Sequence, residues 1–128
     1  MSTARPGLRV LVVDDHAPFR ETAADFLRGL PGIAAVDTAG SGDEALKRAA
    51  AQAFDLVLLD LAMPGMNGLE AARALKKLPS APRVYIASMQ DSQETQAVAR
   101  EAGADAFISK SDFARRLQHL LEATKGRV

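Results

Sequence analysis

Short runs of consecutive apolar residues recur along the chain, and each is followed by a longer stretch in which apolar residues repeat at helical spacing. The runs are too short for buried helices and are rich in β-branched or aromatic residues. They are also continuous rather than alternating, which is typical of strands buried on both faces of a parallel sheet. Strands are predicted at 10–13, 56–59, 84–87 and 106–108, with a weaker one at 33–36.

The stretches between these runs carry the face pattern and the boundary residues of helices. In the first stretch Phe19, Ala23 and Leu27 fall on one face, Pro18 suits the first turn, and Gly29 marks the end.

The later helices are located by their capping residues. Ser41 and Glu44 form a capping-box pattern, in which each side chain would accept a hydrogen bond from the other residue's backbone N–H. The third helix is expected to begin at Asn67 and the fourth near Asp91. A fifth helix carries the apolar residues Phe113, Leu117, Leu120 and Leu121 on one side.

Strand and helix therefore alternate five times with short connections. This order predicts an α/β fold with a single doubly wound (βα)5 parallel sheet and helices on both faces. We expect the flavodoxin-like strand order 2-1-3-4-5. On this interpretation residues 1–128 form one domain, with a core of about 8–124 and a tail or the start of a linker at 125–128.

Composition excludes several classes of protein. Of the 128 residues, 48% are hydrophobic and 25% are charged, which is ordinary for a globular domain, and 16 Lys and Arg balance 16 Asp and Glu. A dedicated nucleic-acid or membrane-surface binder would show a basic excess, so neither is expected. The chain has 0 Cys, no apolar run of membrane-spanning length and no signal-peptide pattern at its start. A cytoplasmic protein is predicted.

Polar residues gather where the predicted strands end. Asp14 and Asp15 follow the first strand, Asp60 follows the third, Ser88 the fourth and Lys110 the fifth. In an open parallel sheet, ligands bind at the carboxyl ends of the strands. These side chains are therefore expected to converge on one cleft.

The residue types at these strand ends favour phosphoryl chemistry. Three carboxylates and one ammonium sum to a formal charge of −2, which one Mg²⁺ would cancel with the oxygen ligands it prefers. An Asp carboxylate can act as a nucleophile and form an aspartyl phosphate. Lys110 would then neutralise oxygen charge, and Ser88 would donate a hydrogen bond to a phosphoryl oxygen.

With these residues in place, the whole chain resembles the receiver domain of two-component response regulators. The resemblance is carried by Asp14-Asp15, by the segment Asp-Leu-Ala-Met-Pro-Gly-Met-Asn-Gly at 60–68, by Ser88 and by Lys110. The residues that follow the acidic pair, from His16 to Arg20, are similar to those of the NarL/FixJ group.

The resemblance implies a role for each site residue. Asp60 would be the phosphoacceptor, and Lys110 and Ser88 would bind the phosphoryl group. Ser88 and Phe107 would be the switch residues, although plain core packing is an equal alternative for Phe107. The implied Mg²⁺ ligands are Asp14, Asp15, Asp60 and the backbone carbonyl of Ala62.

The resemblance also implies partners. A sensor histidine kinase would supply the phosphoryl group, and an output domain or partner protein would read the switch, with dimerisation on phosphorylation as one route. Transcription regulation through a separate or missing helix-turn-helix domain is expected, and a stand-alone chemotaxis-type receiver is the alternative. The chain would not be an enzyme beyond catalysing its own phosphorylation and dephosphorylation.

The chain departs from the family pattern at two places, after Lys110 and around the proposed phosphorylation site. Ser111 follows Lys110 where the family commonly has a cis proline, and a cis bond without proline costs about 3–4 kcal/mol. Ala62 and Gln90 would flank the water that hydrolyses the acyl phosphate.

A flavodoxin-like cofactor binder is disfavoured because Asp14 and Asp15 would repel a phosphate. An aspartyl-nucleophile phosphatase of the haloacid-dehalogenase type would have Asp-x-Asp after the first strand rather than two adjacent residues.

Overall fold

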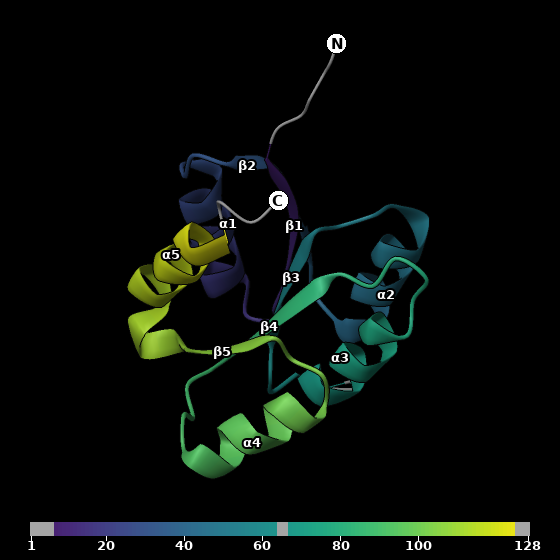
Figure 1. Cartoon of the computed structure of the whole chain (residues 1–128), viewed down its shortest axis with the longest axis vertical. Helices are drawn as coiled ribbons and strands as arrows, with labels where there is room; N and C mark the ends of the chain where they lie inside the picture. The colour runs from purple at the N-terminus through teal and green to yellow at the C-terminus, as the bar shows by residue number, and fades with distance from the viewer. Residues whose placement is uncertain (1–6, 64–66, 125–128) are drawn as a thin grey trace.

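A five-stranded parallel sheet forms the centre of the protein (Figure 1). The structure, a computed structural model, describes residues 7–63 and 67–124. The strand order is β2-β1-β3-β4-β5, which confirms the predicted order. All four neighbouring pairs are parallel, so every strand ends at the same edge of the sheet. The strands are β1 (Leu8–Val13), β2 (Ile33–Ala39), β3 (Leu56–Asp60), β4 (Arg83–Ser88) and β5 (Ala106–Ser109).

Helices cover both faces of this sheet, as a doubly wound fold requires. In Figure 1, α1 and α5 lie on one side of the strands, and α2, α3 and α4 on the other. The helices are α1 (Ala17–Arg28), α2 (Gly42–Ala51), α3 (Gly68–Lys76), α4 (Gln93–Glu101) and α5 (Phe113–Thr124), with a 3-10 turn, η1 (Lys110–Asp112), before the last. Within the described part of the chain, no helix is long and apolar enough to cross a membrane.

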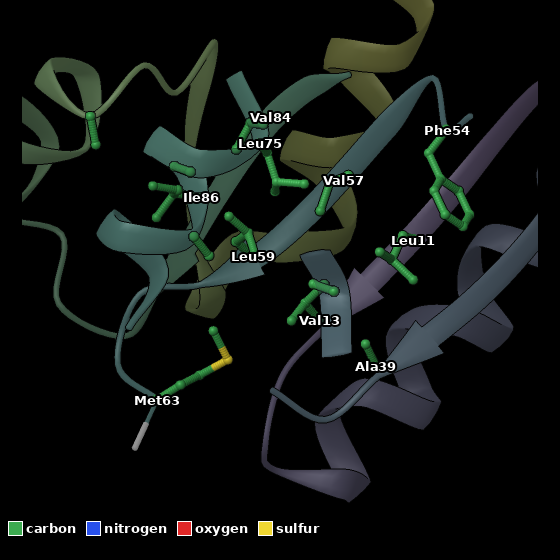
Figure 2. Packing of buried hydrophobic residues seen from close by; sticks show 14 of the residues in the cluster. Leu11, Val13, Ala39, Phe54, Val57, Leu59, Met63, Leu75, Val84 and Ile86 are labelled. Carbon is green, nitrogen blue, oxygen red and sulfur yellow. The ribbon is translucent and has the colours of Figure 1, made fainter. Parts of the chain in front are cut away.

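The sheet separates two apolar clusters because successive strand residues point to opposite faces. In β1, Leu11 and Val13 face the cluster under α2, α3 and α4, whereas Val10 and Val12 face the cluster under α1 and α5. Figure 2 shows the first cluster, in which Leu75 of α3 packs with side chains from β1, β3 and β4. Both faces of the central strands are therefore buried, which explains why their sequences are continuously apolar.

Several boundaries differ from those expected from the sequence. β2 continues to Ala39 rather than ending at residue 36, since it pairs with the full length of β1. The N-cap of α4 is Ser92, whose hydroxyl accepts from the Thr95 N–H at 3.1 Å, so the prediction of Asp91 was one residue early. No cis peptide bond occurs in the described residues, and the Lys110–Ser111 bond is trans. The tail expected at 125–128 lies outside the described residues.

The capping box predicted for α2 is only half formed. The Ser41 hydroxyl accepts from the Glu44 N–H at 3.1 Å, as expected, but the Glu44 carboxylate accepts from the Gly40 N–H at 2.9 Å instead of from Ser41. This hydrogen bond is the main reason why the pKa of Glu44 is lowered. The complete capping box belongs to α3, where Asn67 and Glu70 each accept from the other's backbone.

Candidate functional site

The carboxyl edge of the sheet brings the predicted site residues together. Asp14 directly follows β1, Asp60 and Ser88 are the last residues of β3 and β4, and Lys110 follows β5. All of them line one cleft of about 530 Å³. Its remaining walls are formed by Asp15, His16, Phe19, Leu61, Ala62, Met89 and Gln90. The parallel sheet therefore collects residues that lie up to 96 positions apart in the sequence.

Asp14 is the most firmly held residue of the cleft. It is 1% exposed, and each of its four polar groups has a partner. Its N–H donates to the Ala39 carbonyl at 3.1 Å, and its own carbonyl accepts from Arg20 Nη1 at 2.9 Å. One carboxylate oxygen accepts from the His16 N–H at 2.9 Å and the other from Lys110 Nζ at 2.7 Å. The orientation of Asp14 is therefore fixed by β2, α1 and the residue after β5 together.

The Lys110 ammonium is the counter-charge shared by two buried carboxylates. Its Nζ lies 2.7 Å from Asp14 Oδ2 and 3.1 Å from Asp60 Oδ1. It also lies 4.4 Å from the ring centroid of Phe19, a cation–π contact, and that ring packs edge-on against Phe113. The Phe19 ring, which packs against Phe113, is therefore the apolar neighbour of the ammonium beside the two carboxylates.

The pKa values of Asp60 and Lys110 are both raised. Burial is the main cause for Asp60, and the nearby Asp14 and Asp15 charges add to it, while Lys110 acts in the opposite direction. Burial by itself would lower the pKa of Lys110, but its interactions with Asp14 and Asp60 outweigh burial and raise it. One ammonium compensates two carboxylates, so the cluster retains an excess of negative charge.

The acidic cluster fits a divalent cation. Asp14, Asp15 and Asp60 each offer a carboxylate oxygen within 4.8 Å of the others. Asp15 is exposed, and among the described residues its carboxylate accepts no hydrogen bond and makes no ion pair. Oδ2 of Asp60 likewise has no described partner. A set of hard oxygen donors with a formal excess of −2 matches the preference of Mg²⁺. The cluster could therefore bind such an ion.

Ser88 presents a hydroxyl with its proton available. The residue is 5% exposed and lines the cleft, and its oxygen accepts from the Gln90 N–H at 3.0 Å. Among the described residues its O–H has no acceptor, so it can donate to a ligand in the cleft. Ala62 is exposed at the cleft wall. Phe107 does not line the cleft: it is half-buried in β5 and packs against the cluster under α2, α3 and α4.

Gly68, the first residue of α3, lies directly against the end of β3. Its N–H donates to the Leu61 carbonyl at 3.0 Å. A Cβ added to Gly68 would come within 2.8 Å of Leu61 Cα and closer still to the carbonyl oxygen of Asp60. This close approach fixes the backbone on the carboxyl side of Asp60, and only glycine permits it.

Three contributors to the site were not assigned from the sequence. Phe19 was expected only as a core residue of the first helix, and Arg20 and Gly68 were noted only as parts of a motif. The sequence did hold a signal for Gly68. Glycine has a low helix propensity, so its place at the first helical position, after the Asn cap, indicates a steric reason for having no side chain. The contacts of Phe19 and Arg20 depend on how α1 packs against the end of β1, the strand before it. The spacing of residues in the sequence does not show this packing.

Asp60→Asn is expected to raise the free energy of unfolding at pH 7 in the presence of a chelator. Because the pKa of Asp60 is raised in the folded state, that state loses stability as pH rises from the ordinary value of 3.8 through the folded value. Each unit of pKa shift corresponds to about 1.4 kcal/mol. Urea denaturation of wild type and variant between pH 4 and neutrality would measure the difference.

The matched control is Asp91→Asn, which changes an exposed carboxyl outside the cluster and should alter stability by less than about 0.5 kcal/mol. The gap between Asp60→Asn and wild type should widen as pH increases. A gap that is constant over this range would show that the raised pKa of Asp60 is not its origin.

Fold and site together define a doubly wound receiver-type domain, with an acidic cluster, a hydroxyl and a lysine at one edge of the sheet. The chain belongs to the response regulator receiver domain family, whose model matches residues 10–122. It is thus a receiver domain of the kind found in two-component response regulators, and its predicted likeness to the NarL/FixJ group is confirmed.

Individual relatives support this assignment. The nitrate/nitrite response regulator protein NarL of Escherichia coli strain K12 is 34% identical over 110 residues, covering 86% of this chain and 50% of NarL. A protein-glutamate methylesterase/protein-glutamine glutaminase of Desulfotalea psychrophila is 41% identical over 105 residues, 80% of this chain and 29% of that protein. The signal receiver domain of NarL from Mycobacterium tuberculosis has a TM-score of 0.85 at 32% identity, covering 96% of this chain and all of that one. The chain spans half or less of these curated relatives.

Proposed function

We propose that this chain is a phosphoacceptor switch, which takes a phosphoryl group onto Asp60 with Mg²⁺ held by the acidic cluster. One observation carries the proposal: Asp60 is 8% exposed, lines the cleft, and shares its oxygens between Lys110 and a cluster that fits a cation. The proposed ligands are Asp14, Asp15, Asp60 and the carbonyl of Ala62. A bound Mg²⁺ would neutralise charge on the phosphoryl oxygens.

The Asp60 carboxylate is the proposed nucleophile. One of its oxygens attacks the phosphorus of a phosphohistidine on a sensor kinase, while Lys110, which lies 3.1 Å from Oδ1, and the cation hold the group in place. The O–P bond forms as the N–P bond breaks, and the imidazole nitrogen keeps the electron pair and is protonated by solvent. The transfer replaces the single negative charge of the Asp60 carboxylate with about two on the phosphoryl group. Lys110, whose Nζ lies 3.1 Å from Oδ1, and the bound cation would neutralise this added charge.

Ser88 and Lys110 are the groups that would respond to the new phosphoryl oxygens. The Ser88 O–H donates to no other residue in the described part of the chain, and Lys110 Nζ already lies at the acceptor carboxylate. Movement of Ser88 would pull the residues after β4, and Phe107 in the neighbouring strand would follow as the second switch residue. The altered surface near α4, β5 and α5 would be read by an output domain or partner protein.

The proposed setting is a two-component phosphorelay. A helix-turn-helix output, as the likeness to NarL suggests, would make the whole protein a transcription regulator, whereas docking of the receiver itself to a partner is the alternative. In both cases the chain catalyses only the gain and loss of its own phosphoryl group.

The proposal is tested by incubating the chain with a small phosphodonor, such as acetyl phosphate, and Mg²⁺, and then measuring the intact mass. One phosphoryl adduct is expected on the wild type, and none on Asp60→Asn or when a chelator replaces Mg²⁺. Asp55→Asn is a matched control, because Asp55 follows no strand end of the cleft and instead accepts from the Arg9 N–H at 2.8 Å at the opposite edge of the sheet.

The control variant should acquire the adduct as the wild type does. An adduct that persists in Asp60→Asn would place the acceptor elsewhere, and its absence from the wild type would contradict the proposed function.

A further inference from the structure

Arg20 holds the peptide unit that joins the two acidic residues after β1. Its Nη1 donates to the Asp14 carbonyl at 2.9 Å, from the first turns of α1 back to the strand end that precedes it. The Arg20 side chain is 21% exposed, and its Nε also lies 3.7 Å from Oε2 of the exposed Glu21. The guanidinium lies against Gly40, where an added Cβ would be 3.4 Å from Nη1. Arg20 thus spans the strand end of β1 and the β2–α2 loop.

Asp15 depends on that peptide unit for its position. Asp14 is held through both of its carboxylate oxygens, but the Asp15 carboxylate has no partner among the described residues. Rotation about the bonds flanking the Asp14–Asp15 peptide would swing the Asp15 carboxylate out of the cluster. The hydrogen bond from Arg20 opposes that rotation, because the carbonyl belongs to the peptide that must turn.

We propose that Arg20 is a positioning residue that fixes the Asp14–Asp15 peptide and thereby orients the Asp15 carboxylate toward the divalent cation. The inference rests on the proposed function, since it assumes that the cluster binds Mg²⁺. Residues that orient metal ligands without touching the metal typically contribute a factor of 10–100 in affinity.

The sign of the effect separates positioning from simple charge. Removing a cationic side chain near an acidic site would, by Coulomb's law alone, strengthen the binding of Mg²⁺. Loss of orientation would weaken it. Arg20→Met, which keeps an unbranched side chain but loses the donor, is therefore expected to weaken Mg²⁺ binding about tenfold. Asp15→Ala, which removes the ligand itself, gives the reference for complete loss of this contribution.

Arg28→Met is the matched control. Arg28 lies on the same helix and also donates to a strand carbonyl, that of Val36 at 3.3 Å, but it lies away from the cleft. Mg²⁺ affinity would be measured by calorimetric titration of wild type and variants, after circular dichroism has shown each to be folded. If Arg20→Met does not fold, Arg20→Leu, which also lacks a donor, replaces it. Arg28→Met should bind Mg²⁺ as the wild type does.

A second readout separates binding from chemistry. In Arg20→Met, the Mg²⁺ concentration that gives half-maximal phosphorylation by acetyl phosphate should rise about tenfold, while the rate at saturating Mg²⁺ should stay within about threefold of wild type. Unchanged or stronger Mg²⁺ binding in Arg20→Met, or equal weakening in Arg28→Met, would contradict the positioning role of Arg20 but not the proposed function. Absence of Mg²⁺ binding to the wild type would instead overturn the metal site on which the proposed function depends.

Discussion

Lys110→Met is expected to lower the free energy of unfolding by about 3–5 kcal/mol at neutral pH in the presence of a chelator. The substitution leaves the carboxylates of Asp14 and Asp60, whose side chains are 2% and 9% exposed, without the ammonium that lies 2.7 and 3.1 Å from them. It also removes the cation–π contact with Phe19. Urea denaturation would measure the loss. Added Mg²⁺ should restore more stability to this variant than to wild type.

Lys110→Arg, which keeps the positive charge, should retain most of the stability. The pH dependence offers a further check, because the pKa of Lys110 is raised in the folded state. The stability that Lys110 contributes is fully present below the ordinary pKa of 10.5 and is lost as pH rises through the folded pKa. The wild type should therefore lose this stability at alkaline pH, whereas Lys110→Met should not. A loss below about 1 kcal/mol in Lys110→Met would mean that the carboxylates are solvated rather than compensated by lysine.

Gly68→Ala is expected to destabilise the fold by about 1–3 kcal/mol, the usual cost of overpacking, and to impair phosphorylation as well. Its Cβ would meet Leu61 Cα at 2.8 Å and the Asp60 carbonyl more closely, and no flexible side chain is available to move aside. Either α3 or the end of β3 must shift, and the latter carries Asp60. Denaturation and the rate of phosphoryl adduct formation would measure the two effects.

Gly29→Ala is the control for this substitution. Gly29 caps α1 with a φ of −87°, which alanine adopts freely, and an added Cβ would make only ordinary contacts at 3.7 Å or more. It should leave both stability and phosphorylation near wild type. If Gly68→Ala behaves in the same way, the close approach at the start of α3 does not constrain Asp60.

The sheet, and the ends of the four strands that carry site residues, were predictable because they depend on local patterns. Continuous apolar runs such as 56–59 are buried on both faces, so they could be identified without knowing which helix covers which face. Boundaries were less well predicted: the last residues of β2 are half polar, with Asp37 and Thr38, and are held as a strand by pairing with Leu11 and Val12. That pairing is a tertiary interaction, which the local sequence of β2 does not encode.

The convergence of the site residues was also predictable, since a parallel sheet aligns its carboxyl ends. What the sequence could not show was how charge is shared within the cleft. The contact of Lys110 with both Asp14 and Asp60 depends on side-chain rotamers, as does its approach to the Phe19 ring. Likewise, Phe107 could be placed on β5, but its distance from the cleft became apparent only from the side on which it packs.

The separation of the apolar interior into two clusters has a consequence for how such a domain can diverge. Leu27 of α1 belongs to the cluster on one side of the sheet and Leu75 of α3 to the cluster on the other. Substitutions that do not contact each other act on stability nearly independently. Each layer can therefore accumulate its own changes without a compensating change in the other. The strand backbones, which both layers share, hold the acidic cleft in place while the two layers vary.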